Sequence, residues 1–311
     1  MSFLNIENLI KTYTVDHTNF VGVDDISLTI HKGEFLSIVG HSGSGKTTLI
    51  SIVGGILKPT SGSGTVAGFD VATEAAEIKN RIGYMSQKFS LYADLTVDEN
   101  LRFWAGTYQV WGKKFEDRRE WAIEMTGLGS RRDALVADLP GGFRQRLALS
   151  CALLHQPRVV FLDEPTGGVD PEARRRFWDL IDDLSAEGVT VFVTTHYMDE
   201  AERCHRVALM HAGRLLALDT IAELKQIFPP GTVLEVEGGD APRALESLET
   251  LPGVIDAALF GENLHASVDD PEVATAIQTF LDGKNFASVS VRPVAPSLED
   301  VFIRSIREAE E

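Results

Sequence analysis

The pattern of apolar and polar residues changes between the start of the chain and its middle. Residues 3–10 and 21–31 alternate apolar and polar positions, which is typical of strands with one buried face. Residues 35–39, 159–162 and 189–194 are unbroken apolar or β-branched runs, as in a parallel sheet covered on both faces. We therefore expect an antiparallel sheet first, followed by a parallel sheet.

Helices are expected between these strands, from Lys46 onward and over residues 171–186 and 198–203. Residues 206–210 and 214–218 flank an Ala-Gly turn and predict a terminal hairpin. The strand pattern is lost over residues 90–156, which we interpret as a helical insertion. Five apolar residues at helical spacing are expected to form its core: Val97, Leu101, Trp104, Tyr108 and Trp111.

Two prolines in Phe228-Pro229-Pro230-Gly231 stop any helix there, so we predict domains of residues 1–228 and 229–311. Beyond the prolines the pattern predicts strand, helix, strand, strand, helix and strand, a ferredoxin-like α+β order, and then a last helix. These elements are expected over residues 232–238, 241–251, 254–260, 263–268, 271–283, 286–294 and 297–309. This domain shows no catalytic constellation, and its acidic residues suit a solvated face or a regulatory or dimerising role.

The net charge of −17 argues against nucleic acid as the main partner, because binding to phosphates needs a basic surface. The excess is uneven: from Gly231 onward there are 16 acidic and 5 basic residues, a net of −11. Two cysteines, Cys151 and Cys204, form neither a disulfide framework nor a zinc site. With no visible signal peptide and no apolar stretch near ~20 residues, we expect a soluble cytoplasmic protein.

The strongest chemical motif follows the run at residues 35–39. It matches G-x-x-x-x-G-K-[ST] between a strand and a helix, the setting in which backbone N–H groups surround phosphate oxygens. Lys46 would reach the β- and γ-phosphates, and the Thr47 hydroxyl would ligate Mg²⁺. We predict a nucleoside triphosphate site with these residues: Gly40, His41, Ser42, Gly43, Ser44, Gly45, Lys46, Thr47 and Thr48.

Four further polar residues are candidates for catalysis. Asp163 ends a buried strand and is placed to hold Mg²⁺, while Glu164 can accept a proton from the attacking water. Gln87, in a loop, could touch both the metal and this water, although a lone loop glutamine is usually only solvated. His196, at a strand end, could donate to the γ-phosphate, although such a histidine is more often structural.

Together these motifs resemble the nucleotide-binding subunit of an ABC transporter, from about Leu4 to Lys225. The resemblance implies a P-loop NTPase (RecA-like) α/β core with an antiparallel β subdomain, and ATP and Mg²⁺ as ligands. It makes Lys46, Gln87, Glu164 and His196 catalytic, with Thr47, Gln87 and Asp163 at the metal. It also implies a D-loop ending at Asp170 and an aromatic residue stacked on adenine, either Tyr13 or Phe20.

In this family two domains pair head to tail, and each ATP lies against the signature motif of the other subunit. The motif here is Leu139-Pro140-Gly141-Gly142-Phe143, with Pro140 for the usual serine and Phe143 for the usual glutamine. Gly141 and Gly142 can still present backbone N–H groups to a γ-phosphate. The missing serine hydroxyl removes a hydrogen bond to a charged group, typically about 1.5–3 kcal/mol.

The tail, residues 296–302, resembles the C-terminal extension of ABC-2-type exporter ATPases. This resemblance implies efflux of a drug, antibiotic or lipid through a separate transmembrane permease of ABC-2 type. The subunit would be peripheral on the cytoplasmic face, as a homodimer or with a second ATPase subunit. A non-transport ABC-type ATPase and a low-turnover regulatory module are the alternatives. Permease docking is expected near Phe89, Leu91, Tyr92 and Leu95, unless these side chains fill the core of the insertion.

Overall fold

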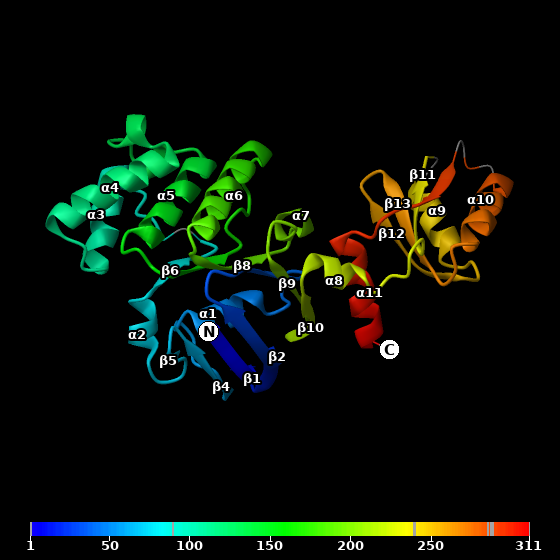
Figure 1. The fold of residues 1–311 in the computed structure, drawn as a ribbon, viewed down its shortest axis with the longest axis horizontal. Coiled ribbons are helices and arrows are strands. Elements are labelled where there is room, and N and C mark those ends of the chain that lie inside the picture. Colours follow the sequence, from blue (N-terminus) through cyan, green and yellow to red (C-terminus); the bar gives the residue numbers. More distant parts are fainter. Residues whose placement is uncertain (1, 89, 239–240, 285, 287–288, 311) are drawn as a thin grey trace. The chain divides into compact units, whose positions relative to one another are not determined.

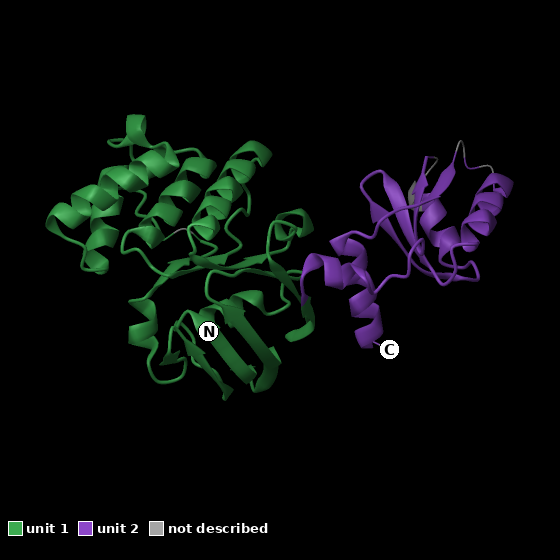
Figure 2. Ribbon diagram, viewed as in Figure 1, with its two compact units in different colours: residues 1–218 green, residues 219–311 purple. Residues whose placement is uncertain are grey.

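The computed structural model describes residues 2–88, 90–238, 241–284, 286 and 289–310. The chain divides into two compact units, Met1–Leu218 and Asp219–Glu311 (Figure 2). The division falls before the two prolines at 229 and 230, because helix α8 (Ile221–Lys225) packs on the last helix, α11 (Leu298–Glu310). Among the helices described, none has the length and apolar character required to cross a membrane.

Unit 1 contains an antiparallel sheet with the strand order β2-β1-β4-β5. Strand β1 pairs with β2 over nearly its full length, and Ile6 lies opposite Leu28 on the buried face. The apolar residues that alternate with polar ones in the sequence therefore lie together on one face of this sheet. The strands are β1 (Ser2–Val15), β2 (Thr18–His31), β4 (Ser61–Val66) and β5 (Phe69–Asp70).

The second sheet of unit 1 has six strands in the order β10-β9-β3-β8-β7-β6. The neighbours from β9 to β6 are parallel, and every residue of β3, β7 and β8 is buried, which confirms the predicted parallel sheet. The strands are β3 (Phe35–Val39), β6 (Ile82–Met85), β7 (Val159–Asp163), β8 (Thr190–Thr195), β9 (Arg206–His211) and β10 (Arg214–Asp219).

Helix α1 (Lys46–Val53) packs against strands of both sheets, and Figure 1 shows it between them. Helix α6 (Pro171–Ala186) begins where the sequence predicts, because Asp170 caps it and Pro171 occupies its first position. Helix α7 (Met198–Ala201) is shorter than expected, and residues 202 and 203 lie in the turn after it. The remaining short helix, α2 (Ala75–Lys79), follows β5.

The predicted helical insertion is present and lies on the side of the six-stranded sheet away from the antiparallel sheet (Figure 1). It consists of α3 (Val97–Thr107), α4 (Gly112–Thr126) and α5 (Gly141–Leu153), which pack on one another. Val97 and Leu101 are buried, but Trp111 is 64% exposed, so its predicted place in the core is wrong. Helix α3 ends at Thr107 and Gln109 turns at φ 57°, which carries Trp111 off the apolar face.

Unit 2 contains the predicted βαββαβ order, and its sheet is antiparallel throughout, with the strand order β12-β13-β11-β14. This order is that of a ferredoxin-like α+β fold. Leu234, Leu264 and Ile277 lie in its own apolar core. The elements are β11 (Val233–Glu237), α9 (Ala241–Leu248), β12 (Val254–Phe260), β13 (Asn263–Val268), α10 (Val273–Gly283), β14 (Ser290–Pro293) and α11.

Candidate nucleotide-binding site

The glycine-rich loop joins β3 to α1 and passes very close to neighbouring backbone. A Cβ on Gly40 would lie 2.2 Å from the carbonyl oxygen of Met210, and one on Gly45 would lie 2.1 Å from that of Gly22. Gly45 also has φ 103°, a conformation that residues with a side chain rarely adopt. Only glycine therefore fits these two positions, and the loop holds its curled path before the N-terminus of α1.

Lys46 is buried inside this loop, with 3% of its surface exposed. Its Nζ donates to the carbonyl oxygens of Gly40, at 2.7 Å, and of His41, at 2.9 Å. Burial lowers the pKa of Lys46, while Glu164 and Asp163 oppose this shift. The ammonium group therefore lies at the centre of the loop, and the nearby Ser44 Oγ is buried with no hydrogen-bond partner among the described residues. Such donors fit a bound phosphate.

Two oxygen groups suited to a hard cation meet beside the loop. Thr47 Oγ1 donates to Asp163 Oδ1 at 3.1 Å, and Thr194 Oγ1 donates to the same oxygen at 2.7 Å. Burial raises the pKa of Asp163, against the lowering effect of these hydrogen bonds. No arginine or lysine among the described residues makes an ion pair with Asp163. A hydroxyl and a buried carboxylate match the ligands that Mg²⁺ prefers.

Three predicted catalytic residues converge on the carboxylate of Glu164. Gln87 Nε2 donates to Glu164 Oε2 at 2.9 Å, and His196 Nδ1 lies 3.5 Å from the same oxygen. Lys46 Nζ lies 3.6 Å from the other oxygen, Oε1. Gln87 is therefore not merely solvated, and His196 is 40% exposed beside the carboxylate, not a packed structural histidine. The four side chains form one cluster at the carboxyl ends of the parallel strands.

A buried acidic residue that sequence reasoning missed supports this cluster. Glu200, 2% exposed, accepts hydrogen bonds from Thr166 Oγ1 and Thr195 Oγ1, each at 2.5 Å. Thr195 precedes His196, and Thr166 lies two residues beyond Glu164. Glu200 therefore ties the loop after β7 to the end of β8. Its sequence setting, in a short acidic helix, gives no indication that the carboxylate is buried.

Tyr13 lies between Phe20, its partner in the sheet, and Thr48 of α1. Tyr13 and Phe20 are directly opposite in the β1–β2 pair and so share a face of the sheet. The Tyr13 hydroxyl is 3.2 Å from Thr48 Oγ1, whereas Phe20 is 55% exposed. Both rings are thus available near the phosphate loop.

The altered signature motif lies at the start of helix α5. Pro140 is the exposed N-cap residue, and no side chain caps the helix there. The Phe143 ring lies under two guanidinium groups, 4.7 Å from Arg131 and 4.4 Å from Arg146. Among the described residues, no hydrogen bond joins this motif to residues 40–48. Asp170 caps α6, accepting from the backbone N–H of Ala173 at 2.9 Å.

A curled glycine loop, a buried lysine and a carboxylate pair at the carboxyl ends of parallel strands define a P-loop nucleotide-binding cassette. Comparison with known proteins agrees. Residues 23–167 match the family described as "ABC transporter", and residues 220–306 match "ATP-binding protein DrrA1-3-like, C-terminal domain". The chain belongs to the ATP-binding proteins of ABC transporters, which confirms the resemblance seen in the sequence.

Two relatives and one solved structure illustrate the likeness. The ATP-binding protein YbhF of Escherichia coli (strain K12) is 43% identical over 215 residues, which cover 69% of this chain and only 37% of YbhF. Nod factor export ATP-binding protein I of Burkholderia thailandensis is 35% identical, with 91% of each chain covered. The dimeric cassette MJ0796, bound to ADP and Pi after hydrolysis, is 28% identical with a TM-score of 0.65, covering 70% of this chain and 98% of that one.

Proposed function

We propose that this chain hydrolyses ATP with Glu164 as the general base. The observation that supports it is the convergence of Gln87, His196 and Lys46 on one carboxylate. Glu164 would accept the proton of the attacking water, and Gln87 would hold that water in line. His196 and Lys46 would donate to the γ-phosphate as charge develops on it.

The residues beside the loop also fit a magnesium ion. Thr47 and Asp163 would hold it, with Gln87 next to it. When bound, Mg²⁺ would neutralise charge on the phosphate oxygens. Lys46, now held by the carbonyls of Gly40 and His41, would then turn to the phosphates. The adenine ring would stack on Tyr13, with Phe20 as the alternative, and Thr48 would keep the Tyr13 ring in place.

The signature motif would serve a second copy of the chain. Gly141 and Gly142 would present backbone N–H groups to the ATP held by the partner, with Pro140 and Asp170 beside them. Two observations support this: the motif makes no hydrogen bond to the phosphate loop of its own chain among the described residues, and the similar cassette MJ0796 is a dimer. The dimer would be head to tail.

The hydrolysis would power export through a separate permease of ABC-2 type on the cytoplasmic face of the membrane. The relatives are named for Nod factor export and for linearmycin resistance, the latter from Bacillus subtilis at 30% identity. Docking would use an exposed aromatic surface of the insertion, formed by Tyr92, Phe103 and Trp111, which are 43%, 43% and 64% exposed. Leu91 and Leu95 are half-buried, and Phe89 lies outside the described residues.

Turnover and ATP binding of Glu164→Gln test the proposal. Binding should persist because Lys46, Thr47 and Asp163 are intact, while phosphate release should fall roughly 10²–10⁴-fold without the base. Glu77→Gln, an exposed glutamate paired with Arg81, is the matched control and should hydrolyse as the wild type does. Equal turnover in the two variants would exclude Glu164 as the base. Negligible wild-type turnover would favour the low-turnover module that Pro140 in the signature motif suggests.

A further inference from the structure

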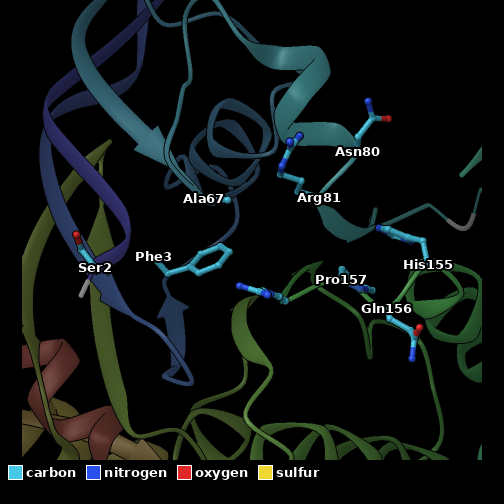
Figure 3. A pocket seen from close by; sticks show the side chains of 9 residues that line it. Ser2, Phe3, Ala67, Asn80, Arg81, His155, Gln156 and Pro157 are labelled. Carbon is cyan, nitrogen blue, oxygen red and sulfur yellow. The ribbon is translucent and has the colours of Figure 1, made fainter.

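Unit 1 contains a cavity that the nucleotide site does not use. Its volume is about 580 Å³, within the range of about 300–1,000 Å³ typical of small-molecule sites. Figure 3 shows Phe3 on one side of the opening, Asn80 and Arg81 above, and His155 with Pro157 on the other side.

This cavity lies at the edge of the sheet opposite the nucleotide site. Arg81 directly precedes β6, and Arg158 directly precedes β7, so both stand at the amino ends of parallel strands. Asp163, at the nucleotide site, ends the same strand β7. The length of a buried strand therefore separates the two, and a ligand of this cavity would not compete with ATP.

The cavity is cationic, although the chain as a whole has a net charge of −17. Two guanidinium groups and, among the described residues, no carboxylate line it. Arg81 pairs with Glu77 at 2.6 Å, but both side chains are about half exposed, and such surface pairs contribute little, typically about 0–1 kcal/mol. Arg158 is exposed, and among the described residues its side chain has no hydrogen-bond or ion-pair partner. Arg158 is thus free to take an acid group.

His155, in the same wall, adds no charge to the cavity. Burial lowers the pKa of His155 to about 4, so the ring is neutral at pH 7. Nε2 lies 3.0 Å from the carbonyl oxygen of Ile82, which only an N–H can approach so closely, and Nδ1 is therefore unprotonated. Nδ1 is buried with no hydrogen-bond partner among the described residues, and stacking on Tyr108 fixes the ring.

Apolar side chains stand on two sides of the cavity. Phe3 is half-buried and packs against the core of unit 1, so its ring has a fixed place, and Pro157 adds a second apolar surface. A flat apolar surface beside a free guanidinium group suits a planar ring that bears an acid group.

We propose that this cavity binds a small organic anion with a planar ring. Its acid group pairs with Arg158, and its ring lies against Phe3.

The test uses 8-anilinonaphthalene-1-sulfonate, a planar aromatic anion whose fluorescence rises on binding. The full chain is first saturated with Mg²⁺ and a non-hydrolysable ATP analogue, so that the nucleotide site is filled. Wild type is compared with Arg158→Glu and with Arg175→Glu. The second variant is a matched charge reversal at an exposed position of α6. N-phenyl-1-naphthylamine, which has the same ring system without the sulfonate, reports apolar binding alone.

We expect Arg158→Glu to lose one class of sulfonate sites, with affinity reduced roughly tenfold or more, the usual effect of losing a hydrogen bond to a charged group. Arg175→Glu should bind the sulfonate as wild type does, and the uncharged dye should not distinguish the variants. Equal sulfonate binding in the two variants would overturn the proposal. So would an equal loss of both dyes in Arg158→Glu, because the acid group would then play no part.

Discussion

Glu164 adopts a backbone conformation that glutamate seldom takes, with φ 45°. Its N–H is held by the carbonyl oxygen and by Oγ1 of Thr194, each at 3.0 Å. Such strained positions cost about 1–3 kcal/mol and persist where neighbours fix them, commonly at functional sites. Here the strain turns the carboxylate toward Gln87 and His196. A motif in the sequence identifies the residue, but only the fold shows this direction.

Asp163 should reduce the stability of the nucleotide-free chain. Burial raises its pKa above 3.8, so the folded state binds a proton more readily than the unfolded state does. Stability is therefore lost as pH rises from 3.8 through the raised pKa. Asp163→Asn should melt at a higher temperature than wild type at pH 8, and the difference should shrink as the pH falls toward 3.8.

Thermal melts with and without Mg·ATP measure two effects of Asp163: its cost to the stability of the nucleotide-free chain and its contribution to stabilisation by Mg·ATP. The same variant should lose the stabilisation by Mg·ATP, because the proposed metal ligand is gone. Asp94→Asn, an exposed aspartate, is the control and should change neither value. A lower melting temperature for Asp163→Asn at pH 8 without nucleotide would contradict the assignment of burial as the dominant effect.

At the scale of elements, the sequence predicted the helices and strands that have a long and uniform pattern of apolar and polar residues. The apolar run of β3 and the capped, proline-started α6 have the predicted bounds. Strand β4 reads Ser-Gly-Ser-Gly-Thr-Val, which resembles a loop, and pairing with β1 makes it a strand. Strand β6 has only four residues, too few to show a period. Tertiary pairing, not local preference, determined both.

Pro140 at the start of α5 offers a test of the altered signature motif. Pro140→Ser adds an N-cap hydrogen bond, which typically stabilises the folded chain by about 1 kcal/mol. Loss of proline raises the conformational entropy of the unfolded chain, which lowers stability by about 0.4–1 kcal/mol. The melting temperature should therefore change little. Turnover should rise, because the hydroxyl restores one donor to the γ-phosphate of the partner. Steady-state phosphate release, with and without the membrane subunit, is the measurement.

Pro140→Ala is the matched control, because it removes the ring and adds no donor. If the serine and alanine variants turn over at the same rate under both conditions, the missing hydroxyl does not limit this enzyme.

The exposed aromatic surface of the insertion should be needed for docking and not for hydrolysis. The Tyr92 and Phe103 rings meet edge to face at 4.5 Å, and Trp111 packs on Gly106, so the surface is rigid without being buried. The double variant Phe103→Ser, Trp111→Ser should co-purify much less of the membrane partner at unchanged basal turnover. Leu259→Ser, an equally exposed apolar residue of unit 2, is the control. Undiminished co-purification of the double variant would place docking elsewhere.

At the scale of the whole molecule, the sequence predicted the residues of the site but did not show that they lie close together. Gln87 follows β6, Glu164 follows β7 and His196 follows β8, and only the order of adjacent parallel strands brings them to one edge. Among the described residues, no hydrogen bond joins the signature motif to the phosphate loop of its own chain. The family resemblance implies that this motif serves a second copy, and the proposed site is incomplete without that copy.

ATP-dependent dimerisation of Glu164→Gln tests this account most directly. In sedimentation velocity the variant should be a monomer without nucleotide and with Mg·ADP, and a dimer with saturating Mg·ATP, since bound ATP joins the loop of one copy to Gly141 of the other and is not hydrolysed. The double variant Lys46→Ala, Glu164→Gln, which lacks the phosphate-binding lysine, should stay a monomer throughout. A Glu164→Gln chain that is saturated with ATP and still sediments as a monomer would contradict the composite site.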